Sequence, residues 1–236
     1  MDQYLEMIVG HIEERFHPVS IFLYGSRARG DQEEISDYEI GVLFSNDNPV
    51  TRTMLRELNP PANFLIYPFH YAQFLKHHID SPFPQNIFFR DLRVSGKTLS
   101  GKSVIEKFTP PPIAVVDLVE RINFDMAFSL AALFSFRTGY SRQAKNDFTK
   151  SCLFGVRCLT ILQDNIFPKT YDEMHERSKS LPLRDFHDVV ANAIAVRHGD
   201  ALQEKFVFRN ISLLNTIVRE KIRGHFNRHG DSVVIQ

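Results

Sequence analysis

A run of three prolines, Pro110–Pro112, constrains this chain more than any other feature. Proline cannot donate a backbone hydrogen bond, and a proline run favours an extended conformation. Before the run, short apolar stretches alternate with helical patterns; after it, apolar residues recur only at helical spacing. We therefore place a domain boundary here, with one domain at residues 1–108 and a second at residues 113–228.

The first domain mixes strands and helices. Helical spacing covers Leu5 to Phe16 and stops before Pro18, and two other helices are expected at 51–58 and 71–78. Compact apolar runs predict strands at 20–24, 38–44, 63–67 and 88–94. Interleaved strands and helices are typical of a small α/β or α+β sheet domain, and we predict the α+β class, with helices flanking the sheet.

The second domain is predicted to be all helical. Apolar stripes at helical spacing lie at 122–133, 148–162, 189–194 and 211–222. Four amphipathic helices with short connections predict an antiparallel four-helix bundle.

Composition excludes several classes of protein. The 236 residues can bury an adequate core, and 28 basic side chains balance 28 acidic ones, so no net charge favours nucleic acid or an anionic membrane. No apolar run approaches membrane-spanning length. Cys152 and Cys158 point away from each other on an expected helix, which fits a reducing compartment. We expect a cytoplasmic protein that does not contact membranes.

The segment from Ile21 to Phe44 carries a chemical signature. An apolar strand ends at Gly25 and Ser26, where glycine lets an anion approach the backbone and serine is a common helix N-cap. Backbone amides at a helix start point toward anions. Arg27 and Arg29 follow, and each suits either a charge-assisted contact with phosphate or a solvated turn.

Two carboxylates, Asp37 and Glu39, stand at the start of the next strand. Because one residue separates them, they project from the same face of the strand. Neighbouring carboxylates repel each other unless a cation lies between them, and Mg²⁺ is commonly held by one or two carboxylates together with substrate phosphates. An anion cradle beside such a pair predicts phosphoryl or nucleotidyl transfer.

This segment resembles the nucleotidyltransferase superfamily related to polymerase beta, in its small prokaryotic branch. The resemblance rests on the run G-S-R-A-R-G and on Asp37-Tyr38-Glu39 in an apolar strand. It implies that Gly25 and Ser26 hold the triphosphate of ATP or another nucleoside triphosphate. Asp37 and Glu39 would then coordinate Mg²⁺, while a hydroxyl of a small molecule or protein attacks the α-phosphorus.

The chain departs from this family at the third carboxylate, which usually stands on a later strand. The corresponding strand, Asn63 to Pro68, contains no acid, and Asn63 offers only a neutral oxygen. The other acids considered are Asp91, Asp117, Glu120 and Asp125. The departure bears on turnover and not on the fold.

The second half resembles the helical bundles of aminoglycoside nucleotidyltransferases and of the helical partners of minimal nucleotidyltransferases. The resemblance rests on Cys152–Leu159, Ile166–Thr170 and Ala195–Arg197. Three functions stay open: magnesium-dependent transfer of a nucleoside monophosphate, most often AMP; an impaired nucleotide-binding or partner-binding module; and a helical RNA-cleaving or RNA-binding protein. Balanced charge makes nucleic acid the least expected partner, and a homodimer is compatible with the sequence.

Overall fold

The protein was analysed as a computed structural model that describes residues 3–33, 36–80 and 83–236. The chain forms two compact units, Met1–Pro111 and Pro112–Gln236, which divide within the proline run. Each unit is described by itself.

The N-terminal unit is built on a four-stranded sheet in the order β3-β2-β1-β4. Its strands are β1 (Ser20–Tyr24), β2 (Tyr38–Phe44), β3 (Phe64–His70) and β4 (Lys97–Gly101). β1 pairs antiparallel with both β2 and β4, whereas β2 and β3 run parallel. Pro68 is tolerated in β3 because that strand lies at an edge of the sheet.

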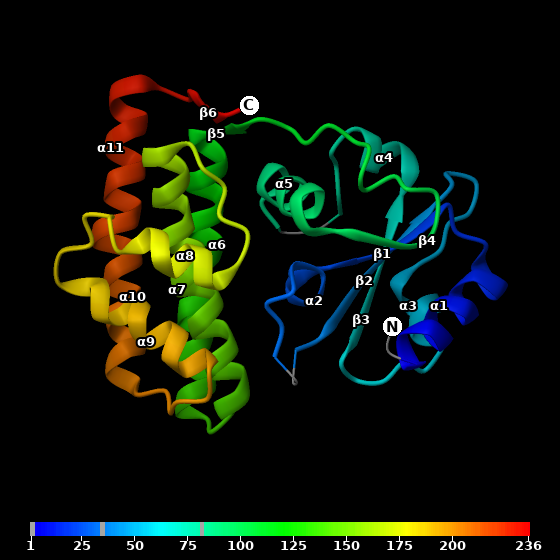
Figure 1. Ribbon diagram of the computed structural model, residues 1–236, viewed down its shortest axis with the longest axis horizontal. Coiled ribbons are helices and arrows are strands. Elements are labelled where there is room, and N and C mark those ends of the chain that lie inside the picture. Colours follow the sequence, from blue (N-terminus) through cyan, green and yellow to red (C-terminus); the bar gives the residue numbers. More distant parts are fainter. Residues whose placement is uncertain (1–2, 34–35, 81–82) are drawn as a thin grey trace. The chain divides into compact units, whose positions relative to one another are not determined.

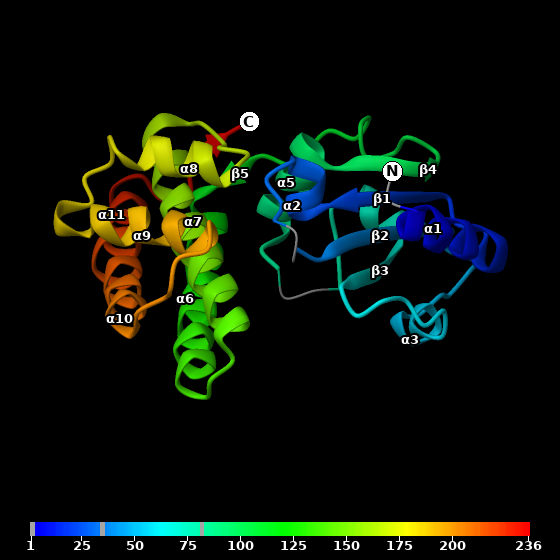
Figure 2. The same cartoon turned by 60° about the horizontal axis from the view of Figure 1, so that its bottom comes forward.

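Helices cover both faces of this sheet (Figures 1 and 2). On one face, α1 (Gln3–Phe16) and α3 (Arg52–Arg56) pack against alternate residues of β1 and β2, including Ile21 and Ile40. On the other face, α4 (Tyr71–Leu75) and α5 (Gln85–Ser95) pack against Phe22 and Leu43. The period-two alternation of a strand thus supplies two cores from one sheet.

One local expectation for this unit was wrong, and one strand was not predicted. The run 88–94, expected to be a strand, lies in α5, whose buried residues are Ile87, Phe89 and Leu92. Burial of this face against the aromatic core overrides the strand propensity of its phenylalanine and valine residues. The fourth strand is β4 instead, which the sequence pattern did not reveal because its residues are polar and partly exposed.

The C-terminal unit is helical, as expected. Its helices are α6 (Val115–Arg137), α7 (Ser141–Asp164), α8 (Tyr171–Ser178), η1 (Arg184–Phe186), α9 (His187–Arg197), α10 (Glu204–Leu213), the π-helical turn η2 (Leu214–Val218) and α11 (Arg219–His229). A short antiparallel pair, β5 (Ile113–Ala114) and β6 (Val233–Ile235), joins the start of α6 to the C-terminal strand.

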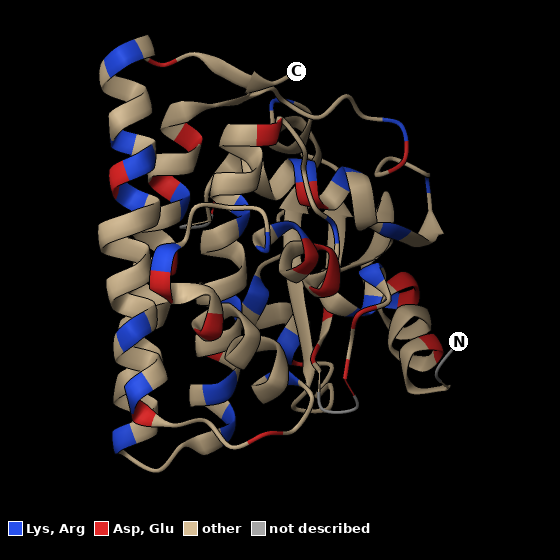
Figure 3. Cartoon of the chain, turned by 60° about the vertical axis from the view of Figure 1, so that its left-hand side comes forward, with Lys and Arg blue, Asp and Glu red and all other residues tan. Residues whose placement is uncertain are grey.

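The expectation of a four-helix bundle is not confirmed, although all four apolar stripes lie on helices. α8 adds an unexpected element, and the fourth stripe runs from α10 through η2 into α11. Lys and Arg recur along α11 (Figure 3), at positions 219, 221, 223 and 228. Ile222 on the same helix is buried. Within the described part of the chain, no helix has the length and apolar character needed to cross a membrane.

Candidate functional site

The expected anion cradle lies at the end of β1. α2 (Gly25–Arg29) begins directly after this strand, and Gly25 has a φ of 73°, which favours glycine. Tyr24 is the N-cap residue of α2, and Ser26 lies in the first turn instead of capping the helix as expected. A methyl group at Gly25 would overlap the Oε2 atom of Glu39, so the glycine is required for close approach of this carboxylate.

Asp37 and Glu39 lie where the sequence predicted them, at the start of β2. Glu39 is paired with Tyr24 across the β1–β2 ladder, while Asp37 directly precedes the strand. Both side chains are half-buried. Among the described residues, neither carboxylate has a hydrogen-bond or ion-pair partner. Two half-buried carboxylates without a partner are unfavourable by themselves, and a bound cation would relieve that cost.

This carboxylate pair fits magnesium by its ligand chemistry. Mg²⁺ prefers oxygen ligands and is typically held by one or two carboxylates, with water and phosphate completing its shell. No group of three or more His, Cys, Asp or Glu side chains within residues 3–33, 36–80 and 83–236 gathers as a metal site.

Tyr24 connects the carboxylates to a second strand. Burial raises the pKa of its phenol well above the ordinary value, electrostatic interactions with Glu39 and then Tyr67 raise it further, and Arg52 lowers it. The rings of Tyr24 and Tyr67 lie 6.4 Å apart between centroids. Tyr67 belongs to β3, where it pairs with Gly41. Tyr24, Glu39 and Tyr67 therefore share one face of the sheet.

Arg27 holds the segment that leads into Asp37. Its Nε and Nη2 atoms donate to the carbonyl of Ser36 at 3.0 and 2.8 Å, and its guanidinium lies 3.9 Å from the ring centroid of Tyr38. The sequence left open a phosphate contact or a solvated turn for this residue. The observed contacts favour a third role, in which Arg27 positions the carboxylate beside it.

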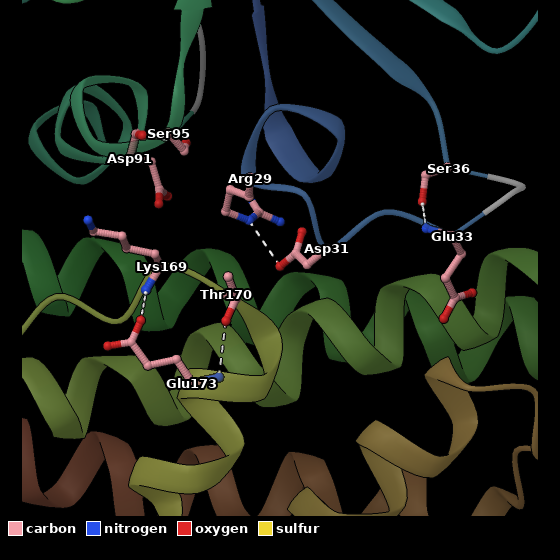
Figure 4. A network of polar contacts seen from close by, with 9 residues as sticks. All are labelled: Arg29, Asp31, Glu33, Ser36, Asp91, Ser95, Lys169, Thr170 and Glu173. Carbon is pink, nitrogen blue, oxygen red and sulfur yellow. Dashed lines mark hydrogen bonds and ion pairs between the residues drawn. The ribbon is translucent and has the colours of Figure 1, made fainter.

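Arg29 is engaged in an ion pair with Asp31. The Nε–Oδ2 distance is 3.2 Å, and the two side chains are only 6% and 8% exposed (Figure 4). In the same loop, the Ser36 hydroxyl accepts a hydrogen bond from the backbone amide of Glu33 at 2.9 Å. These contacts link Glu33 to Ser36 and commit the Arg29 guanidinium to the carboxylate of Asp31.

The structure brings no third acid onto the neighbouring strand. In the β2–β3 ladder, Leu65 pairs with Glu39, and Asn63 accepts a backbone hydrogen bond from Tyr38 at 2.7 Å.

Among the other candidates for the third carboxylate, Asp117 and Asp125 have structural partners. Asp117 accepts from the backbone of Ala114 at 2.7 Å, and Asp125 accepts twice from Arg121. Asp91 lies on α5 and Glu120 on α6.

Two residues near the site escaped the sequence analysis, Arg52 and Tyr67. The guanidinium carbon of Arg52 lies 4.4 Å from the ring centroid of Tyr67. Nothing in the sequence pattern marks either residue, because their proximity depends on the parallel pairing of β2 with β3. Their proximity could have been predicted only by someone who knew how β2 and β3 pair.

Comparison with known proteins agrees with this geometry. No protein-family model matches the sequence, and no curated protein matches it. Among solved structures, the chain is similar to spectinomycin adenyltransferase AAD(9) from Enterococcus faecialis, determined with ATP and spectinomycin. The TM-score is 0.58 at 14% identity, and the match covers 92% of this chain and 97% of that one. The chain has the fold of this adenyltransferase.

At this level of identity, the likeness to AAD(9) shows the fold and no more. It confirms the expected fold, a mixed sheet domain with flanking helices followed by a helical part. The likeness assigns no role to Gly25, Ser26, Asp37 or Glu39.

Proposed function

We propose that this protein is a magnesium-dependent nucleotidyltransferase that moves AMP, or another nucleoside monophosphate, from a triphosphate to an acceptor hydroxyl. The observation that carries the proposal is the half-buried pair Asp37 and Glu39, which lacks a partner among the described residues and of which Glu39 lies against Gly25. Shared fold with AAD(9), whose structure holds ATP and spectinomycin, supports the same reading.

In this mechanism each residue has a distinct task. Asp37 and Glu39 hold magnesium, which when bound supplies charge stabilisation to the reacting phosphate. Gly25 leaves room for phosphate beside the backbone, and the Ser26 hydroxyl is available as a donor. Arg27 keeps the segment before Asp37 in place through its two hydrogen bonds to Ser36. Positioning and electrostatics are the main contributions that phosphoryl chemistry requires of a protein.

Strand β3 carries no acidic side chain that could remove the proton of the acceptor hydroxyl. Leu65 and Tyr67 occupy the positions on this face that pair with Glu39 and Gly41. General-base assistance typically contributes about a hundred- to ten-thousand-fold, so we expect modest turnover. This observation also favours a second candidate function, a nucleotide-binding module that retains the fold but transfers slowly or not at all.

The test is an assay with Mg²⁺, ATP and spectinomycin, the acceptor present in the AAD(9) structure, followed by a panel of other hydroxyl acceptors. Released pyrophosphate and the mass of the modified acceptor are measured, with Asp37→Asn as the inactive control. Magnesium-dependent pyrophosphate release by the wild type alone supports the proposal. Nucleotide binding without release with any acceptor favours the binding module, and the absence of both refutes the two functions together.

A further inference from the structure

Arg52 carries a guanidinium that lies near Tyr24, the cross-strand partner of Glu39. It is the first residue of α3, directly after the capping residue Thr51, whose hydroxyl accepts from the backbone amide of Met54. Within residues 3–33, 36–80 and 83–236, Arg52 has no hydrogen-bond or ion-pair partner. Its one specific contact is the ring of Tyr67, at 4.4 Å.

The contact with Tyr67 directs this charge toward the site. α3 packs on the face of the sheet opposite to Glu39, but Tyr67 stands on the edge strand β3 and projects from the same face as Glu39. A guanidinium over this ring therefore reaches round the sheet edge. Its charge is felt at the phenol of Tyr24, the cross-strand partner of Glu39.

The other two arginines near the cradle are already engaged. Arg27 is bound to the Ser36 carbonyl and Arg29 is paired with Asp31. A nucleoside triphosphate carries roughly four negative charges, and the two carboxylates add two more, which one or two magnesium ions do not fully offset. A polyanion bound here would favour an additional cation from the protein, and arginine is suited to bidentate contact with phosphate.

A purely structural role accounts less well for these observations. Exposed cation–π pairs contribute little to stability, and Arg52 is exposed and lies on a helix of only five residues. Arg56, on the same helix, is equally exposed and lies over no aromatic ring in the described part of the chain. Of the two arginines of α3, Arg52 is therefore the one held toward the site, by its contact with Tyr67.

We propose that Arg52, supported on the ring of Tyr67, is a substrate-binding residue that contacts a phosphate of the nucleoside triphosphate. This inference rests on the proposed function and names a further residue for it. Tyr67 acts through Arg52 and is a positioning residue. Its ring, and not its hydroxyl, is the part required.

The test is calorimetric titration of a nonhydrolysable ATP analogue with Mg²⁺ into the full-length wild type and into Arg52→Gln. Loss of a charged phosphate contact should weaken binding about tenfold to a hundredfold. Arg56→Gln, which removes the same charge from the same helix, should bind as the wild type does. AMP, which lacks the outer phosphates, should bind Arg52→Gln and wild type alike.

The role of the ring is tested with two variants of Tyr67. Tyr67→Phe should keep the affinity for the analogue, and Tyr67→Leu should lose affinity in the same direction as Arg52→Gln. Thermal unfolding midpoints check that all variants remain folded. If the wild type binds the analogue and Arg52→Gln binds it equally well, the inference is wrong and the proposed function stands. If the wild type binds no nucleotide, both are wrong.

Discussion

Both units of this protein hold buried carboxylates paired with arginine, but the sheet unit also holds two half-buried carboxylates without a partner among the described residues. In the helical unit, Asp125 is 1% exposed and accepts from the Nε and Nη2 atoms of Arg121 at 3.0 and 2.7 Å. In the sheet unit, Asp37 and Glu39 are half-buried and have no partner among the described residues. A buried carboxylate with a bidentate partner belongs to the fold, whereas a pair without partners is available to a ligand.

The comparison also separates candidate third acids from structural ones. Asp117 and Asp125 are both buried, yet their carboxylates are occupied by the backbone of Ala114 and by Arg121. Burial alone therefore does not mark a functional acid in this chain. Among the buried and half-buried acids of the described residues, Asp37 and Glu39 are the two without a partner.

The largest loss of stability is expected when the ion pair between Arg121 and Asp125 is broken. Asp125→Ala leaves the Arg121 guanidinium without its bidentate partner in a nearly buried position, which should cost about 3–5 kcal/mol in unfolding free energy. Urea denaturation gives this value directly. A loss below about 1 kcal/mol would mean that Asp125 is not a structural acid and would remove the basis of the contrast.

A smaller loss of stability but a large loss of binding is expected for Gly25→Ala. The new methyl group overlaps the Glu39 carboxylate, so binding of a magnesium–nucleotide analogue should fall by at least about tenfold. Strain at positive φ adds about 1–3 kcal/mol of destabilisation. Gly30→Ala is the matched control, because Gly30 has a φ of 85° and nothing within 4 Å of the added atom. Equal affinities in the two variants would contradict a specific role for Gly25.

Asp37→Asn should change stability very little, in contrast to Asp125→Ala. Removing one of two neighbouring negative charges relieves repulsion, so the unfolding free energy should stay within about 0.5 kcal/mol of wild type or rise. The measurement is urea denaturation without metal or nucleotide. A loss of several kcal/mol would show that Asp37 has a structural partner and is not held ready for a cation.

The smallest effect is expected for the pH dependence of stability that Asp147 in α7 causes. This acid is buried but accepts its hydrogen bond from a neutral side chain, Gln143. Burial raises its pKa, while the hydrogen bond from Gln143 at 2.8 Å and the charge of Lys150 lower it. The native state therefore holds the Asp147 proton more tightly than the unfolded state does. As the pH rises above the ordinary pKa of aspartate, this group reduces the free energy of unfolding. Asp147→Asn should therefore match wild type in acid and become slightly more stable toward neutral pH. Thermal midpoints across that range check the sign, and a variant advantage largest in acid would contradict it.

Much of the sheet unit follows from the sequence because its central strands are continuous apolar runs. The expected strands 20–24 and 38–44 coincide with β1 and β2, and Glu39 on β2 lies against Gly25 at the end of β1, while Asp37 directly precedes β2. The expected helices 51–58 and 71–78 are shorter in the structure, at Arg52–Arg56 and Tyr71–Leu75. Helix ends depend on local contacts that periodicity does not encode.

What the sequence could not provide lies in contacts between distant segments. Arg27 reaches across to Ser36, and Arg52 reaches Tyr67 on another strand, so neither role follows from local pattern. The helix α5 forms where strand propensity predicted a strand, because its apolar side completes the aromatic core around Phe22 and Phe74. Tertiary packing and register decided these cases.

The central claim, that Asp37 and Glu39 hold a metal for a nucleotide, is tested most directly by calorimetry with and without Mg²⁺. A nonhydrolysable ATP analogue is titrated into wild type, Asp37→Asn and Glu39→Gln under both conditions. We predict that Mg²⁺ strengthens binding to the wild type and that this gain is lost in both folded variants. Equal magnesium-dependent gains in all three proteins would contradict the account.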